Sequence, residues 1–213
     1  MVLDKSRESV DPVLTMIAKK FTSVSPDLLT WCALLFSVVA GVFFYFSNPS
    51  SELQNFFLLF AVVFVFLNGL FDAVDGKVAK LTRKASARGD YLDHVLDRYA
   101  DVFMVGALAL SPWCRAPVGL LAMVGVLLTS YMGTQAQAVG YQREYSGLLG
   151  RADRLVLLIV FPVVQHIVLG VSFVLPWNVT VIELVLVYFA VVGNITALQR
   201  FFVTVRWFRK NRL

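Results

Sequence analysis

The sequence predicts an all-α, polytopic membrane protein with six transmembrane helices, preceded by a short amphipathic helix. Of its 213 residues, 58% are hydrophobic and only 15% are charged, whereas soluble domains are nearer half apolar and a quarter charged. About 20 mostly apolar residues cross a bilayer as a helix, so long uncharged runs indicate spans. Five runs lack Asp, Glu, Lys and Arg altogether: 28–51, 53–71, 116–142, 155–182 and 184–199.

The helices can be assigned in order along one domain that covers residues 1–213. Apolar residues at helical spacing beside Lys19 and Lys20 predict an interfacial helix over about 9–22, with Asp11-Pro12 as its start signal. A mobile tail is expected over Arg209–Leu213. The transmembrane spans are expected at about 28–47, 54–74, 91–112, 116–134, 154–175 and 179–200.

The basic residues predict the orientation of the chain. All but two of its nineteen Lys and Arg residues fall in segments that this layout places on one side of the membrane. Basic flanks remain in the cytoplasm, so both termini and the active site are expected on the cytoplasmic side of a cell membrane. The net charge of +5 then reflects topology and attraction to anionic headgroups. A protein that binds nucleic acid would show a basic patch interleaved with aromatic residues, and this sequence has no such patch.

Six of the fourteen acidic residues lie within 71–101, between two hydrophobic runs. Asp72 and Asp75 share a face at the inner end of the second span. Carboxylates this close repel unless they share a cation, and an all-oxygen cluster suits Mg²⁺ or Mn²⁺. The acids of the next helix form one stripe, spaced three, four and four: Asp90, Asp93, Asp97 and Asp101. His94 follows Asp93 on that helix and would point about 100° away from it, which favours a place in a helix interface.

Small and basic residues accompany these carboxylates. Gly76 is expected between the two helices, and it would let a flat ring or a phosphate approach the backbone. Such a site suits a phosphorylated lipid, since two cations can neutralise a diphosphate and one carboxylate can accept a proton from an attacking hydroxyl. The basic residues between the helices are Lys77, Lys80, Arg83, Lys84 and Arg88.

The spacing Asp72-x-x-Asp75-Gly76-x-x-Ala79-Lys80, then eight residues, then Gly89-x-x-x-Asp93-x-x-x-Asp97 resembles the signature of the CDP-alcohol phosphotransferase (CDP-alcohol phosphatidyltransferase) family. The six-span layout is similar too, in particular to the phosphatidylinositol-phosphate and archaetidyl-type synthases. One position departs from the family pattern, which usually has Arg where this chain has Lys80. Lysine keeps the charge and loses the bidentate fork.

The resemblance implies a transferase of phospholipid biosynthesis, commonly a homodimer. It would move the phosphatidyl-type group of CDP-diacylglycerol or CDP-archaeol to an alcohol and release CMP. Asp97 would be the catalytic base. Two divalent ions, Mg²⁺ or Mn²⁺, would be bound by Asp72, Asp75, Asp93 and Asp97. The CDP-lipid would be bound by Asp72, Asp75, Gly76, Ala79, Lys80, Gly89 and, from the start of the first span, Thr30.

The segment 130–156 resembles the acceptor pocket of inositol-phosphate-using members of the family. Gly133 and Gln135 stand where those members have Lys and Arg, whereas Arg154 and Arg200 match pocket arginines. The implied acceptor is a polyol phosphate, such as glycerol phosphate or inositol phosphate, bound by Arg154, Arg200 and Gln135. An unphosphorylated alcohol remains an alternative acceptor. A divalent-cation transporter is the alternative from a different class, because intramembrane acids also mark ion pathways.

The topology makes a labelling prediction. Single cysteines at Ser86 and Ser146 are expected to react with an impermeant thiol reagent only after the membrane has been permeabilised, because basic segments surround both positions. Labelling of either cysteine in intact, right-side-out vesicles would contradict the predicted orientation.

Overall fold

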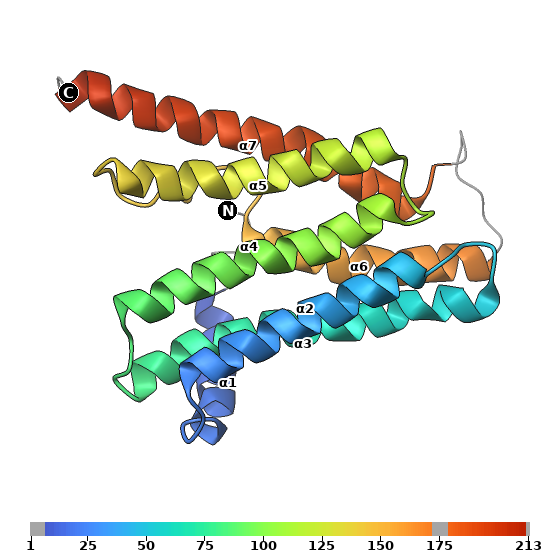
Figure 1. The fold of residues 1–213 in the computed structure, drawn as a ribbon, viewed down its shortest axis with the longest axis horizontal. Coiled ribbons are helices and arrows are strands. Elements are labelled where there is room, and N and C mark those ends of the chain that lie inside the picture. The colour runs from blue at the N-terminus through green and yellow to red at the C-terminus, as the bar shows by residue number, and fades with distance from the viewer. Residues whose placement is uncertain (1–6, 172–178, 212–213) are drawn as a thin grey trace.

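The chain forms a bundle of long helices in a computed structural model that describes residues 7–171 and 179–211. Six helices run side by side, their connections alternate between the two ends, and the described residues contain no strand (Figure 1). The predicted all-α, polytopic class is confirmed. The elements are α1 (Arg7–Lys20), α2 (Pro26–Phe46), α3 (Glu52–Leu81), α4 (Ala87–Leu110), α5 (Ala116–Ala138), α6 (Arg151–Gly170) and α7 (Val181–Asn211).

Five of these helices, α2, α3, α5, α6 and α7, are long and apolar enough to cross a membrane. Helix α4, which carries the acidic stripe from Asp90 to Asp101, falls outside that group. Its 24 residues still extend about 36 Å, more than the roughly 30 Å of a hydrocarbon core. It packs against α2 and α5 within the bundle.

On the outside of the bundle, large apolar side chains such as Leu35, Phe60, Leu120 and Leu198 are exposed, as lipid-facing residues are.

Two helices end well beyond the residues expected from the sequence. Helix α3 continues to Leu81, so Gly76 lies inside a helix and not between two helices. One glycine costs a helix only about 1 kcal/mol, and burial of Val74 and Val78 favours continuation. Helix α7 reaches Asn211, so residues 209–211 of the expected mobile tail are helical. The expected end of the fifth span, at 175, lies outside the described residues.

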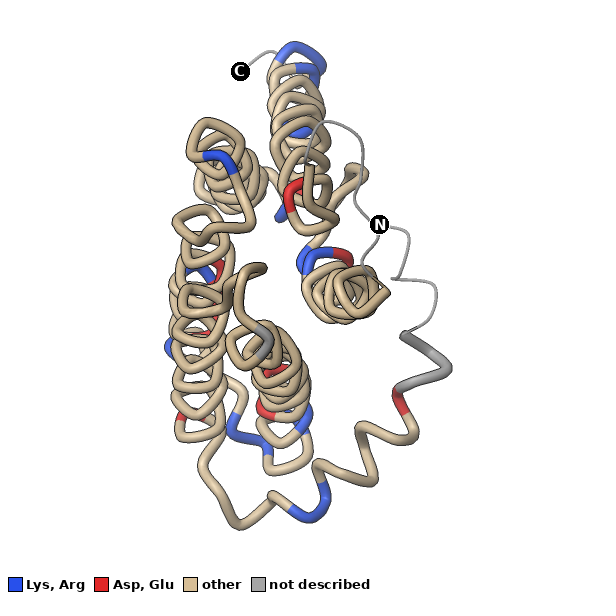
Figure 2. The backbone as a smooth tube through the Cα atoms, turned by 90° about the vertical axis from the view of Figure 1, so that its right-hand side faces the viewer, with Lys and Arg blue, Asp and Glu red and all other residues tan. Residues whose placement is uncertain are grey.

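Helix α1 lies across the bundle and not along it (Figure 2). It begins at Arg7 and runs through Pro12, so Asp11-Pro12 is not its start. Its Ala18 packs in a small apolar cluster with Leu29 of α2 and with Val74 and Val78 of α3. The opposite side of α1 exposes apolar side chains, as expected for an interfacial helix.

Helices α5 and α7 approach each other closely at Gly125 and Gly193. A Cβ atom at Gly125 would lie 2.7 Å from the carbonyl oxygen of Phe189, so only glycine permits this approach. The hydroxyl of Thr129 donates to the carbonyl oxygen of Gly193 at 2.8 Å. The tight crossing brings Arg200, two turns further along α7, against the end of α5.

The far end of the bundle, opposite α1 and the C-terminus, is tied by side-chain contacts. The indole Nε1 of Trp113 donates to the hydroxyl of Ser47 at 2.6 Å. Arg115 pairs with buried Glu183 at 3.0 Å, which joins the start of α5 to the start of α7. These contacts hold the helices together at the end remote from the acidic stretch.

Candidate active site

The predicted carboxylates converge at the end of the bundle that carries α1. Helices α3 and α4 both pack against α2, and their acidic faces meet beside it. The guanidinium of Arg151, from the first residue of α6, contacts Asp72 of α3 at 2.7 Å and also contacts Asp97 of α4. One cation therefore bridges the two halves of the aspartate motif.

Thr30 of α2 orients Asp75 of α3. The Thr30 hydroxyl donates to Asp75 Oδ2 at 2.7 Å and also lies 3.1 Å from the carbonyl oxygen of Pro26 in the preceding turn. Asp75 is buried, with 4% of its surface exposed. A carboxylate held in this way presents its other oxygen in a defined direction. Thr30 thus contacts one of the proposed metal-binding residues, Asp75, and also lines the cavity next to it.

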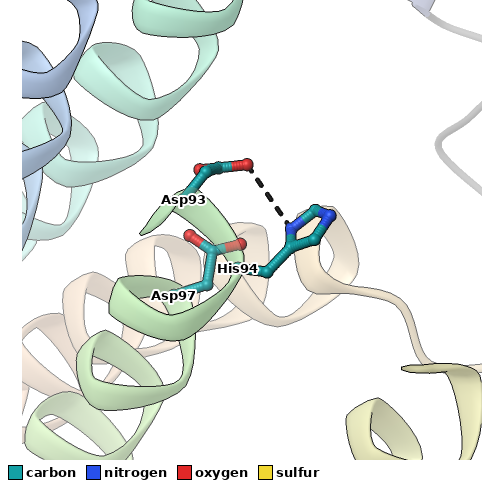
Figure 3. A group of neighbouring side chains, drawn as sticks. All are labelled: Asp93, His94 and Asp97. Carbon is teal, nitrogen blue, oxygen red and sulfur yellow. Dashed lines mark ion pairs between the residues drawn. The ribbon is translucent and has the colours of Figure 1, made fainter. Parts of the chain in front are cut away.

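Asp93, His94 and Asp97 form a compact group on α4 (Figure 3). One ligand atom from each lies within 4.8 Å of the others. The imidazole of His94 lies 3.5 Å from Asp93 Oδ2 and 3.1 Å from Asp90 Oδ1, and it lines the cleft described below. From the sequence, His94 was predicted to lie in a helix interface. The structure turns its ring toward the acids because a one-residue step of about 100° still leaves a long side chain within reach of its neighbours.

The arrangement fits the expected divalent ions. Asp72, Asp75, Asp93 and Asp97 supply only oxygen donors, which Mg²⁺ and Mn²⁺ prefer. Asp93 Oδ1 is buried and has no hydrogen-bond partner among the described residues. A buried carboxylate oxygen ordinarily has a donor or a cation beside it, so this atom is consistent with a metal ligand.

A cavity of about 180 Å³ opens on one side of the carboxylates, between the start of α2, the end of α3 and the start of α4. We call it the small-residue cavity. It brings together six of the residues that the motif assigned to the CDP-lipid: Thr30, Asp75, Gly76, Ala79, Lys80 and Gly89. A Cβ atom built on Gly76 would meet no heavy atom within 4 Å. Glycine at this position leaves open space and is not required by packing.

A second cleft, of about 280 Å³, opens on the other side of the carboxylates. We call it the arginine cleft. Asp93 lines both the cleft and the small-residue cavity, so the two meet at one carboxylate. Gln135, which the family resemblance assigned to the acceptor, is exposed at the end of α5 and does not line the cleft. Five arginines line it: Arg98, Arg143, Arg151, Arg154 and Arg200.

The start of α6 positions two of these arginines. Asp153 accepts a hydrogen bond from the backbone N–H of Gly150 at 2.9 Å and so caps the helix. Arg151 and Arg154 follow three residues apart and therefore share a helix face. Arg154 is 2% exposed and donates to Asp101 Oδ2 at 2.7 Å. Removal of Arg154 would leave Asp101 buried without its partner.

Arg200 of α7 joins α5 to the connection between α5 and α6. Its Nη1 donates to the carbonyl oxygen of Thr129 at 2.6 Å, and its Nε donates to the carbonyl oxygen of Ser146 at 2.9 Å.

Two of the five cleft arginines, Arg154 and Arg200, were predicted from the sequence. The other three were not: Arg98, Arg143 and Arg151. The spacing of Arg151 before Arg154 was a usable signal. Arg143 lies within the segment 130–156 that resembles the acceptor pocket, but no motif position singled it out.

The pattern of the CDP-alcohol phosphatidyltransferase family matches residues 23–207, most of the chain. The chain belongs to the CDP-alcohol phosphatidyltransferase family. It is 28% identical over 175 residues to the archaetidylinositol phosphate synthase of Pyrococcus horikoshii, with 81% of this chain and 88% of that one covered. It is 27% identical to the phosphatidylinositol phosphate synthase of Cutibacterium acnes, with 83% and 84% covered. The predicted family and enzyme class are confirmed.

Solved structures support the fold of this CDP-alcohol phosphatidyltransferase. Phosphatidylinositol phosphate synthase from Mycobacterium tuberculosis, in complex with manganese and citrate, superimposes with a TM-score of 0.67 at 24% identity, covering 90% of this chain and 88% of that one. The same enzyme with CDP-DAG bound also gives 0.67, at 23% identity, covering 91% and 94%. The chain is therefore a membrane transferase of phospholipid biosynthesis.

The open space at Gly76 leads to a prediction. Gly76→Ala should leave the melting temperature in detergent unchanged, since its new methyl group meets no protein atom, while raising the KM for CDP-lipid several-fold by filling the small-residue cavity. Gly170→Ala is the matched control, because it also adds a methyl group in open space, at the end of α6. An unchanged KM in Gly76→Ala would exclude this cavity as the nucleotide site.

Proposed function

We propose that this enzyme transfers the phosphatidyl-type group of a CDP-activated lipid to a polyol phosphate, such as inositol phosphate or glycerol phosphate, and releases CMP. The observation that supports a phosphorylated acceptor most directly is the arginine cleft next to Asp97. The buried Nε atoms of Arg98, Arg151 and Arg154 have no hydrogen-bond acceptor among the described residues. A phosphate entering the cleft would supply oxygens for such donors.

The known relatives favour the same class of acceptor. The Pyrococcus and Cutibacterium relatives are both named for the synthesis of an inositol phosphate lipid. Arginine suits the task because its planar fork matches two phosphate oxygens at once. Arg154 and Arg200 are the acceptor-binding residues that we infer from the family resemblance, and both line the cleft.

The small-residue cavity is the proposed site of the CDP group. Gly76, Ala79 and Gly89 provide a wall without bulky side chains, and Lys80 and Lys84 place positive charge beside it. Cations there would attract a diphosphate. Its position on the other side of Asp93 would put the lipid-side phosphate between the two pockets.

Asp97 is the proposed general base. Its carboxylate lines the arginine cleft, so it would face the acceptor and take the proton from its hydroxyl. That oxygen then forms a bond to the lipid-side phosphorus, while the bond from this phosphorus to the oxygen of CMP breaks. Asp72, Asp75, Asp93 and Asp97 would hold two divalent ions, Mg²⁺ or Mn²⁺, which supply charge neutralisation at the diphosphate. Thr30 and Arg151 keep the carboxylates in place.

We also propose that the site faces the cytoplasm and that the enzyme works as a homodimer. The orientation rests on the basic residues that flank this end of the bundle, where CMP and a phosphorylated polyol would exchange with the aqueous phase. The dimer rests on family resemblance.

An unphosphorylated alcohol is the second candidate acceptor, and one observation favours it. Arg154 is already paired with Asp101, and Arg200 is already bonded to backbone carbonyls. Neither arginine is wholly available to a ligand. A cation transporter is less well supported, since its acids should lie along the pore. Within the described residues the buried acid remote from the site, Glu183, is paired with Arg115.

An acceptor panel tests the proposal. We expect the enzyme to release CMP from CDP-diacylglycerol or CDP-archaeol when inositol phosphate or glycerol phosphate is the acceptor. The release should require Mg²⁺ or Mn²⁺ and should stop when EDTA is added. Free inositol and free glycerol are the matched controls, because they differ from these acceptors only in the phosphate. Release with free alcohols alone would establish the second candidate and refute a phosphorylated acceptor.

The role of Asp97 gives a separate prediction. Asp97→Asn should lower kcat by about 10²–10⁴-fold, the usual cost of losing a general base, while CDP-lipid binding is largely retained. Asp75→Asn is the contrasting variant and should weaken metal and CDP-lipid binding together. Binding can be measured by titration of the purified variants. A rate for Asp97→Asn above a few per cent of wild type would assign the base elsewhere.

A further inference from the structure

The connection between α5 and α6, residues 139–150, folds back over Gly133. The backbone N–H of Glu144 points to the carbonyl oxygen of Gly133, with 3.5 Å between nitrogen and oxygen. Arg200 anchors the same connection through the carbonyl oxygen of Ser146. This segment therefore forms one wall of the arginine cleft, to which it contributes Arg143, Glu144 and Tyr145.

Glycine at 133 is what allows this wall to form. A Cβ atom at this position would lie 2.8 Å from the carbonyl oxygen of Glu144 and 3.0 Å from Nη1 of Arg200. The first contact is with backbone, so a side chain at 133 would have to displace the connection. A lysine at 133, as in the inositol-phosphate-using members that this region resembles, is incompatible with the connection as it lies here.

Arg143 differs from the other cleft arginines in its partners. Arg98, Arg151 and Arg154 each have a carboxylate within 4 Å, and Arg200 bonds backbone carbonyls. Across residues 7–171 and 179–211, Arg143 has neither an ion-pair partner nor a hydrogen bond. Its guanidinium instead lies over the ring of Tyr145, with Cζ 5.2 Å from the ring centroid. Stacking fixes its plane and leaves its donors available.

The cleft also contains a charge that works against phosphate binding. Glu144 is buried beside Arg200, and its Oε1 accepts a hydrogen bond from the backbone N–H of Ser146 at 2.6 Å. Its negative charge offsets part of the attraction that Arg200 would exert. A phosphate in the cleft therefore calls for a cation beyond Arg154 and Arg200, and Arg143 is the arginine there whose charge no carboxylate offsets.

We propose that Arg143 is an acceptor-binding residue, which contacts the phosphate of the polyol phosphate and takes the place of the cation that α5 lacks at position 133. The inference rests on the proposed function, because it assumes a phosphorylated acceptor. It assigns acceptor recognition in part to a connection between helices, where Gly133 permits Arg143 to reach the cleft.

The test is the kinetics of Arg143→Ala. Losing a charge-assisted contact to phosphate should raise the KM of the acceptor by roughly 10- to 150-fold, while kcat and the KM of CDP-lipid stay near wild type. Arg143→Lys should recover part of the loss, since it keeps the charge without the fork. Arg206→Ala is the matched control: Arg206 is exposed on α7 and lines neither pocket.

Gly133→Ala provides a second test that leaves Arg143 in place. By displacing the connection it should also raise the acceptor KM, and the effects of Gly133→Ala and Arg143→Ala should be less than additive because both remove one contact. If wild type uses a polyol phosphate and Arg143→Ala leaves its KM unchanged, this inference is wrong and the proposed function stands. If wild type uses only unphosphorylated alcohols, the proposed function itself is wrong, whatever the variants show.

Discussion

Holding several carboxylates together in an otherwise apolar bundle is the constraint on which the rest of this structure depends. Ionised groups inside a membrane protein are costly unless they are paired. Here the pairing comes from other helices: Thr30 of α2 bonds Asp75, and Arg151 of α6 bridges Asp72 and Asp97. These contacts require α2, α3, α4 and α6 all to reach the same end of the bundle.

The two pockets differ in how firmly the fold defines them. The small-residue cavity is built from the ends of three helices, and on α3 and α4 its motif residues follow at set intervals, so much of its shape follows from helix geometry. The arginine cleft is built from five helices and a connection, and its cations come from separate places in the sequence. A change of one residue on α5, such as glycine at 133, alters which segment can supply a cation. Acceptor recognition can therefore vary while the carboxylate centre stays the same.

Helix spacing explains why much of the carboxylate site could be predicted. Asp93 and Asp97 lie one turn apart on α4, so any helix there places them on one face. The same reasoning failed where the outcome depended on contacts between segments. Gly76 was expected between helices, but α3 continues through it because α1 packs against Val74 and Val78. His94 was expected in a helix interface, and its ring instead lines the cleft.

The sequence by itself determined the helical bundle, its approximate spans and the aspartates at one end, because hydrophobic run length and a helical repeat are local properties. Only the tertiary structure decided which cations meet those aspartates. Arg151 lies 79 residues from Asp72, and no local pattern records that α6 starts beside α3. It also decided that Gln135 faces outward from α5, and that Arg143 enters the cleft because the connection packs on Gly133. Packing between distant segments sets these positions, and spacing along one helix does not contain them.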